Sequence, residues 1–129
     1  MIHPSTFLSR ALLADAIFSG VAALALTLGA GVLAPVLNLP EALLRETGLF
    51  LIAYTALVGW LAARSSVPKA LLLLVIVGNA AWTLGSIALL FSGAVAPNLL
   101  GQIFIVAQAI ATGVFAELQY VACAGATPR

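Results

Sequence analysis

The stretch KALLLLVIVGNAAWTLGSIALLF, residues 69–91, decides the fold of this chain. It contains one charged residue, Lys69, and as a helix that rises about 1.5 Å per residue it exceeds the roughly 30 Å of hydrocarbon in a bilayer. Its apolar residues are continuous rather than alternating, which excludes a strand of a membrane barrel. The stretch therefore predicts a helix that crosses a membrane, because a helix satisfies its backbone hydrogen bonds internally.

Three further apolar runs have the same character, at about 11–34, 42–63 and 99–121. Pro35 predicts the end of the first run, because proline cannot donate a backbone hydrogen bond inside a helix. Together the four runs predict an all-α fold class: a polytopic membrane protein with four transmembrane helices in an antiparallel bundle. The loops between the runs are short, so we expect a single domain over residues 1–129.

The composition excludes a water-soluble monomer. Of 129 residues 64% are hydrophobic and 7% are charged, against about 45–50% and about 25% in an average soluble domain. The hydrophobic content also excludes a disordered chain. We therefore expect the lipid bilayer to be the principal partner, and a net charge of +1 gives no basis for binding nucleic acid.

Metal and cofactor sites have few candidate ligands. The chain has one histidine, His3, and one cysteine, Cys123, which are too few for a zinc, haem or iron–sulfur ligand set. No pairing of a nucleophile with a base is visible. We therefore expect no cofactor, no metal and no catalytic residues, and predict that the protein is not an enzyme.

The cations indicate an orientation in the membrane. Arg10, Arg64, Lys69 and Arg129 fall on one side of a chain with four spans, and Arg45 alone falls on the other. Lys and Arg in short loops stay on the cytoplasmic side. The sequence therefore predicts a multi-pass protein of the cell inner membrane with both termini in the cytoplasm.

Two carboxylates lie inside the predicted spans. Asp15 and Glu117 are each about four residues from the cytoplasmic end of their helices, or roughly 6 Å deep. Arg10 and Arg64 are close enough in depth to be charge partners. One hypothesis is that the carboxylates form a proton-responsive or cation-binding pair with coupled titration. The alternative is that they fix the helix ends beside the arginines.

A second polar group lies near the predicted midplane. Asn79, Thr83 and Ser86 follow the spacing of one helix face, and Gln108 lies about ten residues into the fourth span. We expect this stripe to face protein, with a hydrogen bond from Asn79 to Gln108 across the two helices. The alternative is a small polar cavity that binds a ligand.

Short motifs give a resemblance that spans nearly the whole chain. The third span contains Gly78-Asn79-Ala80-Ala81-Trp82, and the fourth contains Gln108-Ala109 followed by Ala116-Glu117-Leu118-Gln119. This pattern resembles small, uncharacterised four-helix inner-membrane proteins of bacteria. The resemblance implies a fold and a compartment, and it carries no functional residues across.

Function is the least constrained property. Pairs of small residues four apart, such as Ala16 with Gly20 and Ala109 with Gly113, are typical of close helix packing in lipid. Because the polar residues of the spans can all be explained as contacts within a bundle, the leading hypothesis is a structural or accessory subunit that packs as a homo-oligomer or within a larger membrane complex. The alternative is a small proton-coupled transporter that uses Asp15 and Glu117.

Overall fold

The computed structural model describes residues 2–125 and 127–128. Over those residues the chain is all-helical apart from two strands of two residues each. Each of its four helices is long and apolar enough to span a membrane. The elements are β1 (Ile2–His3), α1 (Thr6–Leu37), α2 (Glu41–Ala62), α3 (Lys69–Ser92), α4 (Leu99–Ala124) and β2 (Thr127–Pro128).

The first helix is longer than the sequence predicts. It begins at Thr6, where the Ser5 hydroxyl accepts a hydrogen bond of 3.1 Å from the backbone N–H of Leu8. It also continues through Pro35 instead of ending there. The helix ends at Leu37 and is capped by Asn38, which has a φ of 54° and whose N–H donates to the carbonyl of Ala34. Pro35 cannot donate the helical bond to the carbonyl of Gly31, but only the last turn follows it, so the lost bond disturbs little of the helix.

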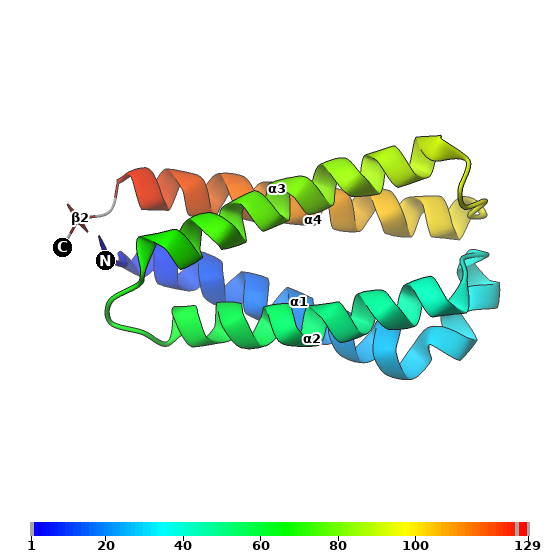
Figure 1. Ribbon diagram of the computed structural model, residues 1–129, viewed down its shortest axis with the longest axis horizontal. Coiled ribbons are helices and arrows are strands. Elements are labelled where there is room, and N and C mark those ends of the chain that lie inside the picture. Colours follow the sequence, from blue (N-terminus) through cyan, green and yellow to red (C-terminus); the bar gives the residue numbers. More distant parts are fainter. Residues whose placement is uncertain (1, 126, 129) are drawn as a thin grey trace.

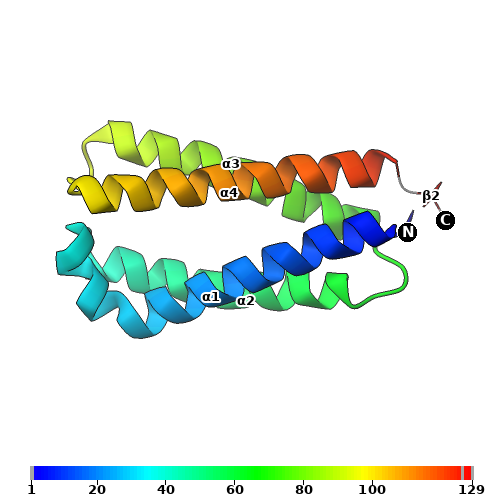
Figure 2. The same ribbon diagram turned by 180° about the vertical axis from the view of Figure 1, so that it is seen from behind.

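The helices lie side by side along the length of the molecule (Figure 1). The α1–α2 loop and the α3–α4 loop are at one end, which we call the loop end. Both termini and the α2–α3 loop are at the other end, which we call the terminal end, and the same arrangement is seen from behind (Figure 2). Helix α1 packs against α2 and α4, and α3 packs against α4, whereas α2 and α3 make much less contact.

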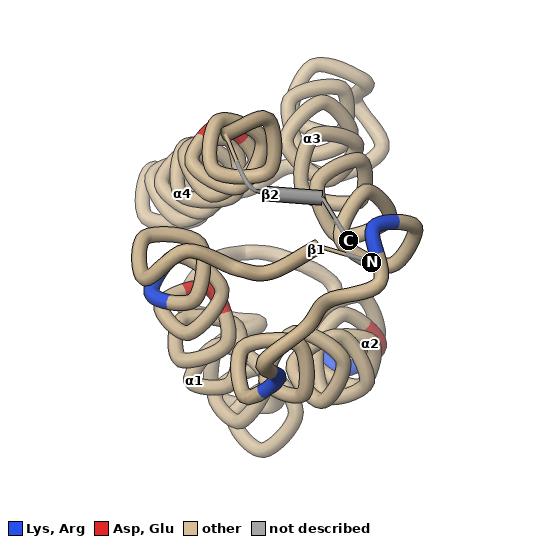
Figure 3. Tube along the Cα trace, turned by 90° about the vertical axis from the view of Figure 1, so that its left-hand side faces the viewer, with Lys and Arg blue, Asp and Glu red and all other residues tan. Residues whose placement is uncertain are grey.

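The terminal end is tied together by backbone hydrogen bonds. Strand β1 pairs antiparallel with β2, and Figure 3 views the four helices from this end. Ile2 also exchanges two bonds with Val67 of the α2–α3 loop, with N···O distances of 2.9 and 2.8 Å. The start of the chain, its end and its middle loop are therefore held at one place.

At the loop end, two asparagines tie the hairpin loops together reciprocally. The Asn38 side-chain amide donates to the carbonyl of Ala96, and the Asn98 amide donates to the carbonyl of Val36 over 2.7 Å. Asn98 also caps α4, since its Oδ1 accepts a bond of 2.9 Å from the N–H of Gly101. The α1–α2 hairpin is thus fastened to the α3–α4 hairpin at both ends.

The apolar core is filled most completely near the terminal end. Its largest fully buried side chains come from α1, α2, α3 and the α2–α3 loop: Leu8, Leu12, Val58, Leu61, Val67, Leu72 and Val75. A second, smaller cluster near the loop end is built around Leu26, Ala30, Leu37, Leu39, Leu44 and Ile105.

Candidate functional site

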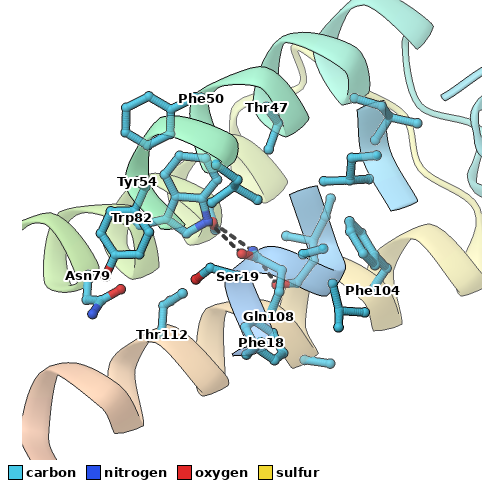
Figure 4. Close-up of a pocket in the computed structure, with 18 of the residues that line it drawn as sticks. Phe18, Ser19, Thr47, Phe50, Tyr54, Asn79, Trp82, Phe104, Gln108 and Thr112 are labelled. Carbon is cyan, nitrogen blue, oxygen red and sulfur yellow. Dashed lines mark hydrogen bonds between the residues drawn. The ribbon is translucent and has the colours of Figure 1, made fainter. Parts of the chain in front are cut away.

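A cavity of about 540 Å³ lies between the two hairpins and is lined by residues of all four helices. Its walls are mainly aliphatic and aromatic, as the close-up shows (Figure 4). This volume is within the range of about 300–1,000 Å³ that is usual for small-molecule pockets. The aromatic lining residues are Phe18, Phe50, Tyr54, Trp82 and Phe104.

The cavity reaches the outer surface of the bundle. Three of its large apolar lining residues are more than half exposed: Ile17 and Val21 of α1, at 59% and 65%, and Phe50 of α2, at 56%. Gly78 of α3 also lines the cavity, and a Cβ atom built on it would meet no other atom within 4 Å. The space is therefore open from the side of the bundle, and the small residue at position 78 helps to keep it open.

Asp15 is fully buried close to one end of this cavity and accepts four hydrogen bonds. The hydroxyl of Ser19 donates to Oδ1 over 3.1 Å. Oδ2 accepts from Tyr54 Oη at 2.7 Å, from Asn79 Nδ2 at 3.0 Å and from Gln119 Nε2 at 2.8 Å. We call these five residues the Asp15 cluster. It joins all four helices through one carboxylate.

No cation accompanies this carboxylate among the residues that the structure describes. Among these residues the one ion pair is remote from Asp15. It joins Arg45 and Glu41 on the surface of α2, with 3.0 Å between Nη1 and Oε2. Arg10, one predicted partner of Asp15, is exposed. Arg64, the other, donates to the carbonyl of Ser66 over 2.9 Å and lies 4.5 Å from the ring centroid of Trp60.

The structure does not bring Asp15 and Glu117 together. Glu117 is exposed on α4, whereas Gln119, two residues further on, is fully buried and bonds to Asp15. Two residues along a helix turn the side chain by about 200°. The depth of the two carboxylates was inferred from the sequence, but the face of α4 that turns inward carries Gln119.

The expected hydrogen bond between Asn79 and Gln108 is not formed either. The Asn79 amide donates to Asp15 and, over 3.1 Å, to Gln119 Oε1. Gln108 instead accepts a bond of 2.6 Å from Trp82 Nε1 and donates to Ser86 Oγ over 2.8 Å. Counting residues from the helix ends placed Asn79 level with Gln108, but in the bundle Asn79 lies level with Gln119.

The polar stripe of α3 does lie against α4. Besides Asn79 and Ser86, the Thr83 hydroxyl donates to the carbonyl of Ala109 over 2.9 Å and lies 2.7 Å from the Thr112 hydroxyl. Three polar contacts therefore join α3 to α4 at successive levels: Asn79 with Gln119, Thr83 with Thr112, and Ser86 with Gln108. Trp82, beside the stripe, also stacks on Phe50 of α2 with 5.5 Å between ring centroids.

Three residues of the Asp15 cluster were not predicted as site residues: Ser19, Tyr54 and Gln119. Ser19 follows Asp15 by four residues, which is the spacing of helix neighbours, so the sequence carried a signal for that contact. Tyr54 and Gln119 reach Asp15 from other helices. Their contacts depend on the rotation of α2 and α4 about their axes, for which the sequence gives no comparable spacing.

Comparisons with protein-family models, with curated proteins and with solved structures gave no match to this chain. The resemblance of its short motifs to small bacterial inner-membrane proteins therefore stays a prediction. Among the residues described, no group of three or more His, Cys, Asp or Glu side chains is placed to hold a metal ion. What the site can bind follows from the cavity and from the Asp15 cluster.

Proposed function

We propose that the four helices cross a bacterial inner membrane as an antiparallel bundle, with both termini in the cytoplasm. The apolar length of each helix supports the crossing. Arg10, Arg64 and Lys69 belong to the terminal end, and Arg45 belongs to the loop end beside an acidic partner. This distribution supports a cytoplasmic terminal end. Arg129, which the sequence also placed on this side, lies outside the described residues.

Labelling of single cysteines tests this orientation. In a chain with Cys123 replaced by Ser, we expect Ser65→Cys at the terminal end to react with a membrane-impermeant maleimide only from the cytoplasmic side. Ala94→Cys, in the α3–α4 loop, should react only from the opposite side. Labelling of both from one side contradicts the proposed topology.

We further propose that the protein binds a hydrophobic small molecule, which enters the cavity from the bilayer. The observation that carries this proposal is the cavity itself, which is apolar, of ligand size and reaches the lipid-facing surface. In lipid, packing between helices is the main source of stability, so an unfilled space of this size is costly unless it is occupied. An accessory subunit needs no such space, which favours ligand binding over a purely structural role.

A small transporter remains a second candidate, because a carrier needs the same binding site as its first step. The buried carboxyl group of Asp15, which has no cation beside it among the described residues, favours the transporter. The exposed position of Glu117 removes the second carboxylate from that mechanism, so a carrier of this kind would work with Asp15 alone.

Filling the cavity tests the binding proposal. The full chain is placed in nanodiscs, and binding of the neutral solvatochromic dye Nile red is measured against empty nanodiscs. Gly78→Leu adds a large side chain at the exposed edge of the cavity, so we expect saturable binding to weaken at least about tenfold. Gly85→Leu is the matched control, because Gly85 is on the same helix, also has open space at its Cβ and does not line the cavity.

The control should bind the dye as the wild type does. Equal binding by Gly78→Leu and Gly85→Leu contradicts a site in this cavity, as does the absence of saturable binding to the wild type.

A further inference from the structure

The hydrogen bonds of the Asp15 cluster determine which chemical groups face the cavity. Ser19 and Tyr54 each have one hydroxyl hydrogen, and both give it to Asp15. Asn79 has two amide hydrogens and gives them to Asp15 and Gln119. The orientation of this amide is fixed, since its nitrogen lies against two acceptor oxygens and its oxygen must point away from them.

These three donors, and not the carboxylate, line the cavity. Ser19, Tyr54 and Asn79 are lining residues, whereas Asp15 lies behind them. Figure 4 shows Asn79, Ser19 and Tyr54 on the opposite side of the cavity from Phe104. Because all of their polar hydrogens are already donated to Asp15 and Gln119, these residues can offer only oxygen lone pairs to a ligand. This end of the cavity therefore accepts hydrogen bonds and does not donate them.

The same end also holds a buried carboxyl group with no cation beside it among the residues that the structure describes. A buried carboxylate is costly without a cation nearby, and the four groups that bond to Asp15 are all neutral. The apolar walls screen this charge weakly, so it attracts a cation that enters the cavity.

From these observations we propose that the ligand is a hydrophobic amine, with an apolar or aromatic body and an ammonium group. The ammonium supplies the hydrogen-bond donors that Ser19, Tyr54 and Asn79 lack, and the positive charge that Asp15 lacks. This inference rests on the proposed binding function and names its ligand class. An apolar alcohol would supply a donor but no charge, and an apolar carboxylic acid would bring a like charge.

Three probes of one shape test the inference on the wild-type chain. 2-Naphthylmethylamine, 2-naphthylmethanol and 2-naphthoate are used to displace Nile red in nanodiscs of zwitterionic lipid, with each corrected for its partition into empty nanodiscs. We expect the amine to bind at least about tenfold more tightly than the alcohol, and the carboxylate to bind most weakly. Equal affinity for amine and alcohol, or tighter binding of the carboxylate, overturns the proposal.

Asp15→Asn separates the charge from the shape of the site. In this variant we expect the affinity for the amine to fall to within about threefold of the affinity for the alcohol. The affinity for the alcohol should stay within about twofold of its wild-type value. A preference for the amine that survives this change overturns the role of Asp15. If the variant no longer binds the alcohol, its cavity has not folded, and Ser19→Ala takes its place.

Ser19→Ala removes the hydroxyl that lies between Asp15 Oδ1 and the cavity. The preference for the amine should then stay or increase, and its loss overturns the proposal. The failure of the ligand class is distinguishable from failure of the binding function. If only the ligand class is wrong, Nile red still binds to the wild type and Gly78→Leu still weakens that binding. If the binding function is wrong, Nile red shows no saturable binding that Gly78→Leu weakens.

Discussion

The two halves of this bundle are built from the same four helices but are packed differently. Toward the terminal end, Leu8, Leu12, Val58 and Leu61 are all fully buried and fill the space between the hairpins. Toward the loop end, the hairpins border a cavity of about 540 Å³ that is open at the side of the bundle. The difference shows that apolar composition is sufficient for a long helix. The size of the side chains that face the bundle axis decides whether neighbouring helices pack tightly or leave a cavity.

The two hairpins that border the cavity are joined to each other at both ends of the bundle. Asn38 and Asn98 tie the two loops to each other, and Ile2 ties the start of the chain to the α2–α3 loop. Between these points the cavity walls carry small residues such as Gly78 and Ser19. Collapse onto them would require the tied ends to move.

The largest expected effect comes from emptying the filled half. Leu12→Ala removes a side chain with no exposed surface, so we expect it to lower the free energy of unfolding by about 2–5 kcal/mol. Leu28→Ala is the control, because Leu28 is 81% exposed and should change stability by less than about 1 kcal/mol. Steric-trapping measurements in bicelles give both values. Equal costs at the two positions contradict the assignment of a filled core at the terminal end.

A smaller effect is expected at the tie between the loops. Asn98→Ala removes the α4 cap and the bond to the carbonyl of Val36, which should cost about 0.5–2 kcal/mol. Gln102→Ala, which loses a weak bond of 3.4 Å to the carbonyl of Pro97, is the nearby control. We also expect Asn98→Ala to weaken Nile red binding, because the tie maintains the spacing across the cavity. Unchanged stability and binding in Asn98→Ala contradict a role for the tie.

The smallest effect is expected at Glu117. Because this side chain is exposed and lies on the opposite face of α4 from Gln119, Glu117→Gln should change stability by less than about 0.5 kcal/mol. Amine binding should also be unchanged. A loss of amine binding as large as that of Asp15→Asn restores the hypothesis that the two carboxylates act as a pair.

The sequence predicted the helices well because their signal is local. Continuous apolar runs such as residues 69–91 specify a helix wherever they are placed, and α3 (Lys69–Ser92) closely follows that run. The prediction that the first helix ends at Pro35 was wrong. Helix α1 continues through Pro35, which lies in its last turn, to Leu37. Local sequence patterns thus predict the position of a helix reliably, and they predict its last turn less reliably.

The contacts of the site could be predicted only in part. Asp15 and Asn79 stand out in a sequence with so few polar residues in its spans, but their meeting depends on the axial offset and the rotation of α1 against α3. A single sequence contains no spacing that fixes these two quantities. The cavity was weighed as an alternative from the polar stripe, yet its position and its aromatic walls come from packing across all four helices.

The most direct test of the account is to locate a bound hydrophobic amine in the wild-type chain. A naphthyl amine that carries a photoreactive diazirine is irradiated with the protein in nanodiscs, and the modified residues are identified by mass spectrometry. The account predicts adducts on cavity residues such as Phe50 and Trp82, which are lost in Gly78→Leu and kept in Gly85→Leu. Adducts confined to exposed residues outside the cavity, such as Leu28 and Val32, would contradict it.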